Sequence, residues 1–135
     1  MTTATSGLTT TTSGRLLRTS LVLDGVASGL SGVLIAALSG VLDTVLGAST
    51  MLLLDIGLFF VAYGAAVLVI GTRNVINRTA ASAVAAANLL WTVAGVVVLI
   101  AETLSLTTLG VVTALALAVV TTVFAELQIT GLRRA

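Results

Sequence analysis

The 135-residue sequence contains no cysteine, proline or histidine, and its six basic residues are all arginine, so lysine is absent as well. Without cysteine there can be no disulfide, thiolate metal site or thiol chemistry. Without histidine and lysine, the commonest general base and every Schiff-base mechanism are missing. We therefore expect neither catalytic residues nor a cofactor or metal site. Without proline, we expect no helix to be kinked by the usual means.

Charge is scarce too. Only 8% of the residues are charged and 58% are hydrophobic, and the mean hydropathy is +1.22. A soluble domain is about 25% charged and about 45–50% apolar. So few charges cannot form the polar surface of a soluble fold, and the composition predicts an integral membrane protein whose partner is the lipid bilayer. A net charge of +1 argues against nucleic acid as a partner.

Four long apolar runs dominate the chain. Each has close to the ~20 residues that a helix needs to cross a ~30 Å hydrocarbon layer, and backbone groups in lipid must pair within their own helix. Because the connections are short, consecutive helices should be antiparallel neighbours. The sequence therefore predicts an all-α, up-down-up-down four-helix bundle over residues 19–131. The predicted helices are at about 20–42, 51–71, 80–101 and 105–129, with 41–46 as the polar end of the first.

The two ends of the chain differ from this membrane domain. Residues 1–18 begin with a stretch rich in threonine and serine and should form a flexible cytoplasmic tail. Residues 132–135 should form a basic C-terminal tail. A short repeat, VLIA at residues 33–36 and 98–101, suggests that the bundle consists of two tandem helical hairpins in the same orientation.

The arginines predict the orientation in the membrane. They precede the first helix, lie between the second and third, and follow the fourth, and four antiparallel helices bring these segments to one side. Basic residues in short flanking segments are retained in the cytoplasm. We therefore expect a multi-pass protein of a bacterial cytoplasmic membrane with both termini inside. The six residues are Arg15, Arg18, Arg73, Arg78, Arg133 and Arg134.

Small residues recur at helical spacing in the first and last predicted helices. Such spacing lets helix backbones approach closely, and this contact drives association in lipid. The stripes indicate either packing within the bundle or an interface with a second copy or another membrane protein. The residues are Gly25, Gly29, Gly32 and Ala36 in the first helix, and Gly110, Ala114 and Ala118 in the last.

Four residues form the candidate polar site within the membrane: Asp24, Asn88, Trp91 and Glu126. Asp24 is either an acid at the membrane interface, paired with an arginine, or a carboxylate that binds a proton or cation, since ionisable groups in membrane helices often mark transport paths. Asn88 and Trp91 form either a polar clamp between helices or the wall of a small pocket. Glu126 ends the small-residue stripe of the last helix, and we expect it to pair with an arginine.

Several segments resemble a group of small four-helix integral membrane proteins of bacteria that are common in actinobacteria. They are ANLLW at 87–91, LSLTTLG at 104–110, FAELQ at 124–128 and GLRR at 131–134. Members of this group often have Gly-Pro before the segment matching 104–106, where this chain has Glu102 and Thr103. The resemblance implies a fold and a membrane location, but no activity.

Two functions remain open on this evidence. The first is a non-enzymatic membrane component that packs with itself or with a partner, as the small-residue stripes favour. The second is a small proton- or cation-coupled transporter or channel that uses Asp24 and Asn88. An Asp24–Asn88 contact without a cavity would favour the first function.

Overall fold

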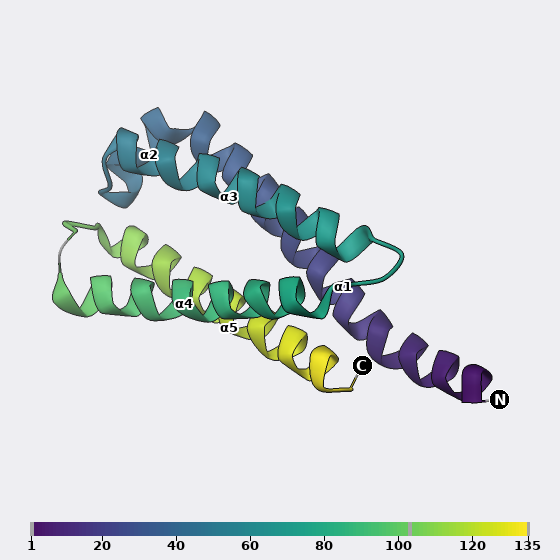
Figure 1. The fold of residues 1–135 in the computed structure, drawn as a ribbon. Coiled ribbons are helices and arrows are strands. Elements are labelled where there is room, and N and C mark those ends of the chain that lie inside the picture. Colours follow the sequence, from purple (N-terminus) through teal and green to yellow (C-terminus); the bar gives the residue numbers. More distant parts are fainter. Residues whose placement is uncertain (1, 103, 135) are drawn as a thin grey trace.

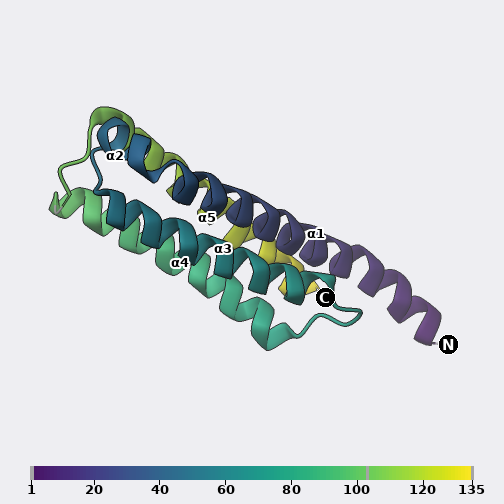
Figure 2. The same ribbon diagram turned by 90° about the horizontal axis from the view of Figure 1, so that it is seen from above.

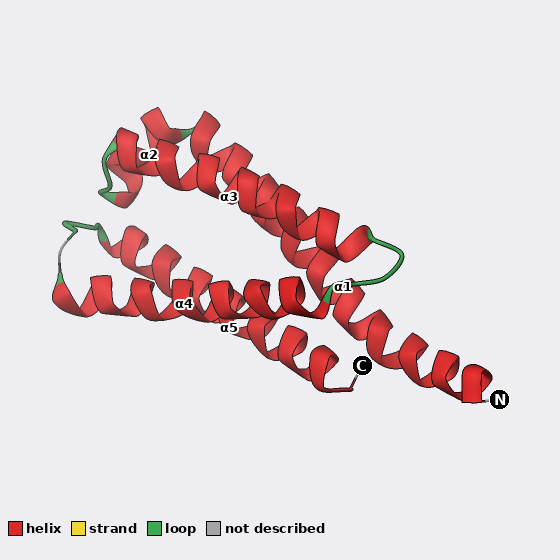
Figure 3. Ribbon diagram, viewed as in Figure 1, coloured by secondary structure: helices red, strands yellow, loops and turns green. Residues whose placement is uncertain are grey.

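A computed structural model describes residues 2–102 and 104–134, which form helices joined by short loops, without a strand in the described part of the chain (Figures 1 and 3). The helices are α1 (Thr2–Ala37), α2 (Ser39–Leu46), α3 (Thr50–Thr72), α4 (Arg78–Ala101) and α5 (Thr108–Arg134). Four segments are long and apolar enough to cross a membrane: Gly14–Ala37 of α1, and α3, α4 and α5. The predicted all-α class with four spanning helices is confirmed.

The helices extend beyond the predicted limits at both ends of the chain. α1 begins at Thr2, in the segment predicted to be a flexible tail, and α5 continues to Arg134, in the predicted basic tail. Elongating an existing helix needs no new nucleus, so polar flanks can continue the helices that the apolar segments nucleate. The apolar part of the first helix, from Gly14 onward, is the part that can span a membrane.

The first predicted span, 20–42, is divided at Leu38. This residue leaves helical geometry (φ −102°, ψ 11°), and α2 begins at the next residue. Beyond the break, the Ser39 hydroxyl donates a hydrogen bond to the carbonyl of Ala36 (3.0 Å). Gly47 ends α2 with a left-handed backbone (φ 77°), and its N–H bonds to the Asp43 carbonyl (3.0 Å). Residues 41–46, expected as the helical end, therefore belong to a separate short helix.

α1 and α3 form a hairpin in which glycines bring the two backbones together. A Cβ added to Gly32 would lie 2.5 Å from the carbonyl oxygen of Gly57, and one added to Gly64 would lie 2.6 Å from that of Gly25. No side chain fits at these positions. Gly25, Gly32 and Ala36 of the predicted stripe are thus in contact with α3 within the same chain, whereas a Cβ added to Gly29 would meet nothing within 4 Å.

α4 and α5 form the second hairpin. Four alanines are among their buried residues, and two of these, Ala81 and Ala125, are completely buried. α1 joins the two hairpins by packing against α5 as well as α3, and Gly131 of α5 lies against Leu17 of α1. α3 and α4 touch little and diverge away from the loop that connects them (Figure 1). The four spanning helices therefore follow the order α3, α1, α5, α4, with the weakest contact between α3 and α4.

Both termini and the α3–α4 loop lie at one end of the molecule (Figure 2). A buried apolar cluster closes this end; it comprises Leu17, Leu21, Val67, Ala81, Val84 and Leu132. The guanidinium of Arg18 also ties α1 to the end of α3, donating to the carbonyls of Gly71 (2.7 Å) and Arg73 (2.6 Å). The arginine-bearing segments therefore share one end of the bundle, as the sequence predicts.

Candidate functional site

The carboxylate of Asp24 lies buried among all four spanning helices and is only 1% exposed. Its Oδ2 accepts hydrogen bonds from Tyr63 Oη on α3 (3.0 Å), Asn88 Nδ2 on α4 (2.9 Å) and Gln128 Nε2 on α5 (2.9 Å). Its Oδ1 accepts one from Ser28 Oγ on α1 (3.1 Å). We call these five residues the Asp24 cluster. One acidic group thus joins helices that lie far apart in the sequence.

The two amides of the cluster also bond to each other. Asn88 Nδ2 donates to Gln128 Oε1 (3.0 Å), and both side chains are buried, at 3% and 0% exposure. An unpaired polar group in an apolar interior costs several kcal/mol. Across the residues that the structure describes, every buried side-chain nitrogen and oxygen has a hydrogen-bond partner. The cluster is therefore a complete network around a carboxylate.

The groups that surround the carboxylate are all neutral. Its donors are two hydroxyls and two primary amides. The arginines nearest in the fold bond elsewhere: Arg18 donates to carbonyls at the end of α3, and Arg78 donates to the carbonyl of Leu132 (2.7 Å). Of the two alternatives for Asp24, the described residues do not show pairing with an arginine, because its carboxylate bonds to hydroxyls and amides.

A cavity of about 300 Å³ lies next to the cluster. Asp24, Ser28 and Asn88 form its polar end, and all four spanning helices contribute to its lining. The remaining wall includes five aromatic side chains: Phe59, Phe60, Tyr63, Trp91 and Phe124. An apolar cavity with a few converging polar groups is the usual form of a small-molecule site.

Trp91 is the centre of the aromatic wall. Its ring lies parallel to that of Phe59, with centroids 6.1 Å apart, and meets Phe60 edge-on at 4.9 Å. These contacts join α4 to α3 across the cavity. Phe59 on α3 is 53% exposed and Leu90 on α4 is 69% exposed, and both line the cavity. The edge of the cavity between α3 and α4 therefore faces the lipid.

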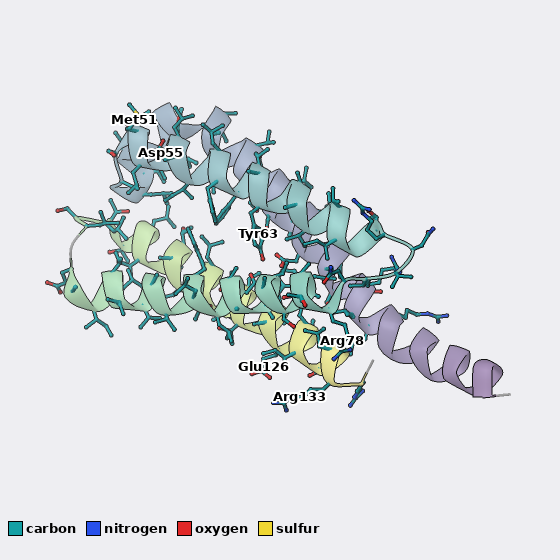
Figure 4. All side chains as sticks on the ribbon, viewed as in Figure 1. Met51, Asp55, Tyr63, Arg78, Glu126 and Arg133 are labelled. Carbon is teal, nitrogen blue, oxygen red and sulfur yellow. The ribbon has the colours of Figure 1, made fainter. Side chains whose placement is uncertain are left out.

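The structure brings together three of the four predicted site residues: Asp24 and Asn88 bond directly, and Trp91 lies one helical turn from Asn88. It does not bring Glu126 to them. Glu126 is exposed and lies on the side of α5 away from Tyr63 (Figure 4). Each step of four residues turns about 40° beyond a full turn, and Glu126 is two such steps after Ala118. Glu126 is therefore rotated by about 80° from the buried face of α5 on which Ala118 lies.

The residues of the predicted small-residue stripe in the last helix contact two different helices. Gly110 lies against the carbonyl of Leu46, at the end of α2, and Ala118 packs toward Thr92 of α4. Ala114, between them, is half-buried. These contacts are all within the chain, with α2 and α4.

Gln128 was not among the predicted site residues. It lies five residues before Arg133, where a polar residue is expected near the membrane surface. The signal was an alternating spacing of three and four residues, which stays on one helix face. Along α5 this spacing connects Ala118, Thr121, Ala125, Gln128 and Leu132, which are buried apart from half-buried Thr121.

The fold and the site define a small multi-pass helical membrane protein with a buried acidic cluster beside a cavity open to lipid. No protein-family model, curated protein or solved structure matches the chain.

Proposed function

We propose that the protein is a small proton- or cation-coupled transporter of a bacterial cytoplasmic membrane, in which Asp24 is the group that binds the proton or cation. The observation that carries this proposal is the position of the Asp24 carboxylate. It lies in the middle of the bundle, contacts all four spanning helices, and forms the polar end of an aromatic cavity. Both termini are on the cytoplasmic side, together with the arginines.

A purely structural role does not require an ionisable group. An asparagine at position 24 would offer a similar shape and similar hydrogen bonds without burying a charge. Placing a carboxylate at the centre of a membrane helix costs roughly 2.5–3.5 kcal/mol on insertion scales. The negative charge of Asp24 therefore needs a reason beyond holding helices together, and reversible binding of a positive charge supplies one.

The two amides allow the cluster to serve both states of the carboxylate. A side-chain amide carries two N–H donors and a carbonyl acceptor. With Asp24 ionised, Asn88 and Gln128 direct N–H groups at it (2.9 Å each). When Asp24 holds a proton or meets a cation, rotation of both amides together presents their oxygens to it and reverses the bond between Asn88 and Gln128. The network can therefore remain satisfied while the charge changes.

The chemistry of the cavity favours a small organic cation. Aromatic faces attract cations, with Trp the strongest, and Trp91, Phe59 and Phe60 line the same cavity as the carboxylate. Protonation of Asp24 would remove the negative charge that holds such a ligand. Binding of a proton and binding of the cation then compete, which is the basis of exchange across a membrane.

The alternative role, a membrane component that packs with itself or a partner, has less support. Its main argument was the small-residue stripes of the first and last helices. Gly25 and Gly32 contact α3, and Gly110 and Ala118 contact α2 and α4, all within the chain. Asp24 and Asn88 bond to each other, and both also line a cavity.

The test is proton flux in proteoliposomes that contain a trapped pH-sensitive dye, with benzyltrimethylammonium on one side as the probe cation. We expect the wild-type protein to exchange protons for this cation, and Asp24→Asn to reduce the exchange at least tenfold. Glu126→Gln is the matched control, because it removes an exposed carboxyl outside the cluster. Equal flux in wild type and Asp24→Asn, or wild-type flux no faster than in empty liposomes, would contradict the proposal.

A further inference from the structure

A second site lies on another face of α4, in a groove between α4 and α5 at the arginine end of the molecule. The groove has a volume of about 330 Å³ and shares no lining residue with the Asp24 cavity. Its α4 side is formed by Arg78, Ser82, Ala86 and Leu89, which follow one another at helical spacing. The groove therefore runs along the helices, toward the middle of the membrane.

The chemistry of the groove changes along its length. Arg78 is the first residue of α4, and Arg133 is next to last in α5, so both lie at the level where a membrane meets water. Farther along, Ala86, Leu89 and Ile129 make the lining apolar. Glu126, an acidic residue on the same part of α5, is not among the lining residues. A positive end followed by an apolar channel complements a molecule with an anionic head and a hydrocarbon chain.

The α4 wall of the groove, from Arg78 to Leu89, is about as long as one leaflet of a bilayer is thick. Eleven residues separate Arg78 from Leu89, and a rise of 1.5 Å per residue makes this about 16 Å. Half of a ~30 Å hydrocarbon layer is about 15 Å. An acyl chain that begins at the arginines would therefore reach the end of the groove near the middle of the membrane.

The guanidinium of Arg78 is held across the two helices. One of its N–H groups donates to the carbonyl of Leu132 on α5 (2.7 Å), which positions it at the head of the groove. A guanidinium has five N–H donors in a planar fork that fits phosphate oxygens, and the bond to Leu132 uses one of them. Arg133, exposed on the other side of the groove, supplies a second guanidinium.

We propose that this groove binds an anionic phospholipid. Its phosphate lies between Arg78 and Arg133, and one acyl chain lies along Ala86 and Leu89. Basic pockets between membrane helices on the cytoplasmic side bind anionic headgroups in this manner. The site is independent of Asp24, so it stands whether or not the protein is a transporter.

The test is native mass spectrometry of the full-length protein in detergent, titrated with phosphatidylglycerol or phosphatidylcholine. We expect tighter binding of phosphatidylglycerol, and we expect Arg133→Gln to weaken it about fivefold, the effect of one basic residue near an anionic lipid. Arg134→Gln is the matched control, because it removes the same charge from the adjacent residue, which does not line the groove; it should change binding less than twofold. Equal losses in the two variants, or equal binding of the two lipids, would overturn the proposal.

A second pair of variants separates a lipid from free phosphate. Ala86 is exposed and lines the groove, whereas Ala83 is exposed on the same helix but does not line it. Ala86→Phe should fill the apolar part and weaken binding of phosphatidylglycerol at least fivefold, while Ala83→Phe should not. If inorganic phosphate displaces the lipid equally from wild type and Ala86→Phe, the groove is a phosphate site and the lipid proposal is wrong.

Discussion

The two boundaries of α3 show how side-chain volume divides this small bundle into a closed and an open part. Toward α1, glycines let the backbones approach so closely that a Cβ on Gly57 would lie 2.7 Å from the Gly32 carbonyl oxygen. Toward α4, Phe59 and Phe60 meet Trp91, and a cavity of about 300 Å³ remains. In lipid, packing and not water exclusion drives helix association, so aromatic side chains can hold two helices apart.

We expect the α1–α3 boundary to determine the stability of the protein and the α3–α4 boundary to determine ligand binding. The closed α1–α3 boundary should tolerate almost no added atom, whereas the open α3–α4 boundary should accept added volume at the expense of ligand binding. Substitutions at matched positions test whether the two boundaries differ as described.

The largest effect is expected at the closed boundary. Gly32→Leu places a side chain where the nearest atom is 2.5 Å from the Cβ position, and overpacking against a backbone cannot relax easily. We expect a loss of about 3 kcal/mol of stability or failure to fold, measured by thermal unfolding and size-exclusion chromatography in detergent. Gly95→Leu, on α4, is the control, because its added Cβ would meet nothing within 4 Å. Similar behaviour of the two variants would refute the tight α1–α3 contact.

A smaller effect is expected where Arg18 ties α1 to the last carbonyls of α3. Replacing it with glutamine removes charge-assisted bonds to Gly71 and Arg73 (2.7 and 2.6 Å). A hydrogen bond that involves a charged group contributes about 1.5–3 kcal/mol to stability. We therefore expect Arg18→Gln to lower the free energy of unfolding by about 2 kcal/mol, measured by thermal unfolding. Arg15→Gln, which replaces an exposed arginine one turn earlier, should change stability much less. If both variants unfold alike, glycine packing alone holds the closed boundary.

Gln128→Leu tests the part of the Asp24 cluster that comes from α5. The substitution removes the bond to Asp24 (2.9 Å) and the acceptor for Asn88 (3.0 Å). Hydrogen bonds between membrane helices average about 0.6 kcal/mol, so two lost bonds should cost about 1 kcal/mol in unfolding measurements. Proton flux should fall as well, because Asp24 loses a donor. Unchanged flux and stability together would show that Gln128 is not part of the working cluster.

The smallest change in stability is expected at the open boundary. Ala94 is exposed and lines the cavity. Ala94→Phe should therefore change the free energy of unfolding by no more than about 0.5 kcal/mol. The added ring should fill the cavity and block binding of benzyltrimethylammonium. Val93→Phe is the control, since Val93 is exposed but lies outside the cavity lining. Retained binding in Ala94→Phe would place the ligand elsewhere.

The spanning helices were predictable because apolar length alone defines them. The sequence also indicates the antiparallel order and the gathering of arginines at one end. The break at Leu38 was not predictable from proline, because the chain has none. Hydropathy also does not separate the spanning part of α1 from α2, because apolar residues continue across the break.

The site was predictable only in part. Asp24 and Asn88 stand out as polar residues within apolar runs. Glu126 was predicted as a site residue in place of Gln128. The two are two residues apart, about 200° around a helix, so they lie on opposite faces of α5. Only tertiary packing shows which of these faces points inward. The cavity depends on the angle between α3 and α4, which no single helix encodes.

The most direct test of the account is a fluorescence titration of Trp91, the only tryptophan in the chain, which lines the cavity beside the Asp24 cluster. Adding benzyltrimethylammonium to the purified wild-type protein should change its emission in a saturable manner. Asp24→Asn should weaken the apparent affinity at least tenfold. A titration that is the same in wild type and Asp24→Asn, or that does not saturate in wild type, would contradict the claim that this carboxylate binds a cation in the cavity.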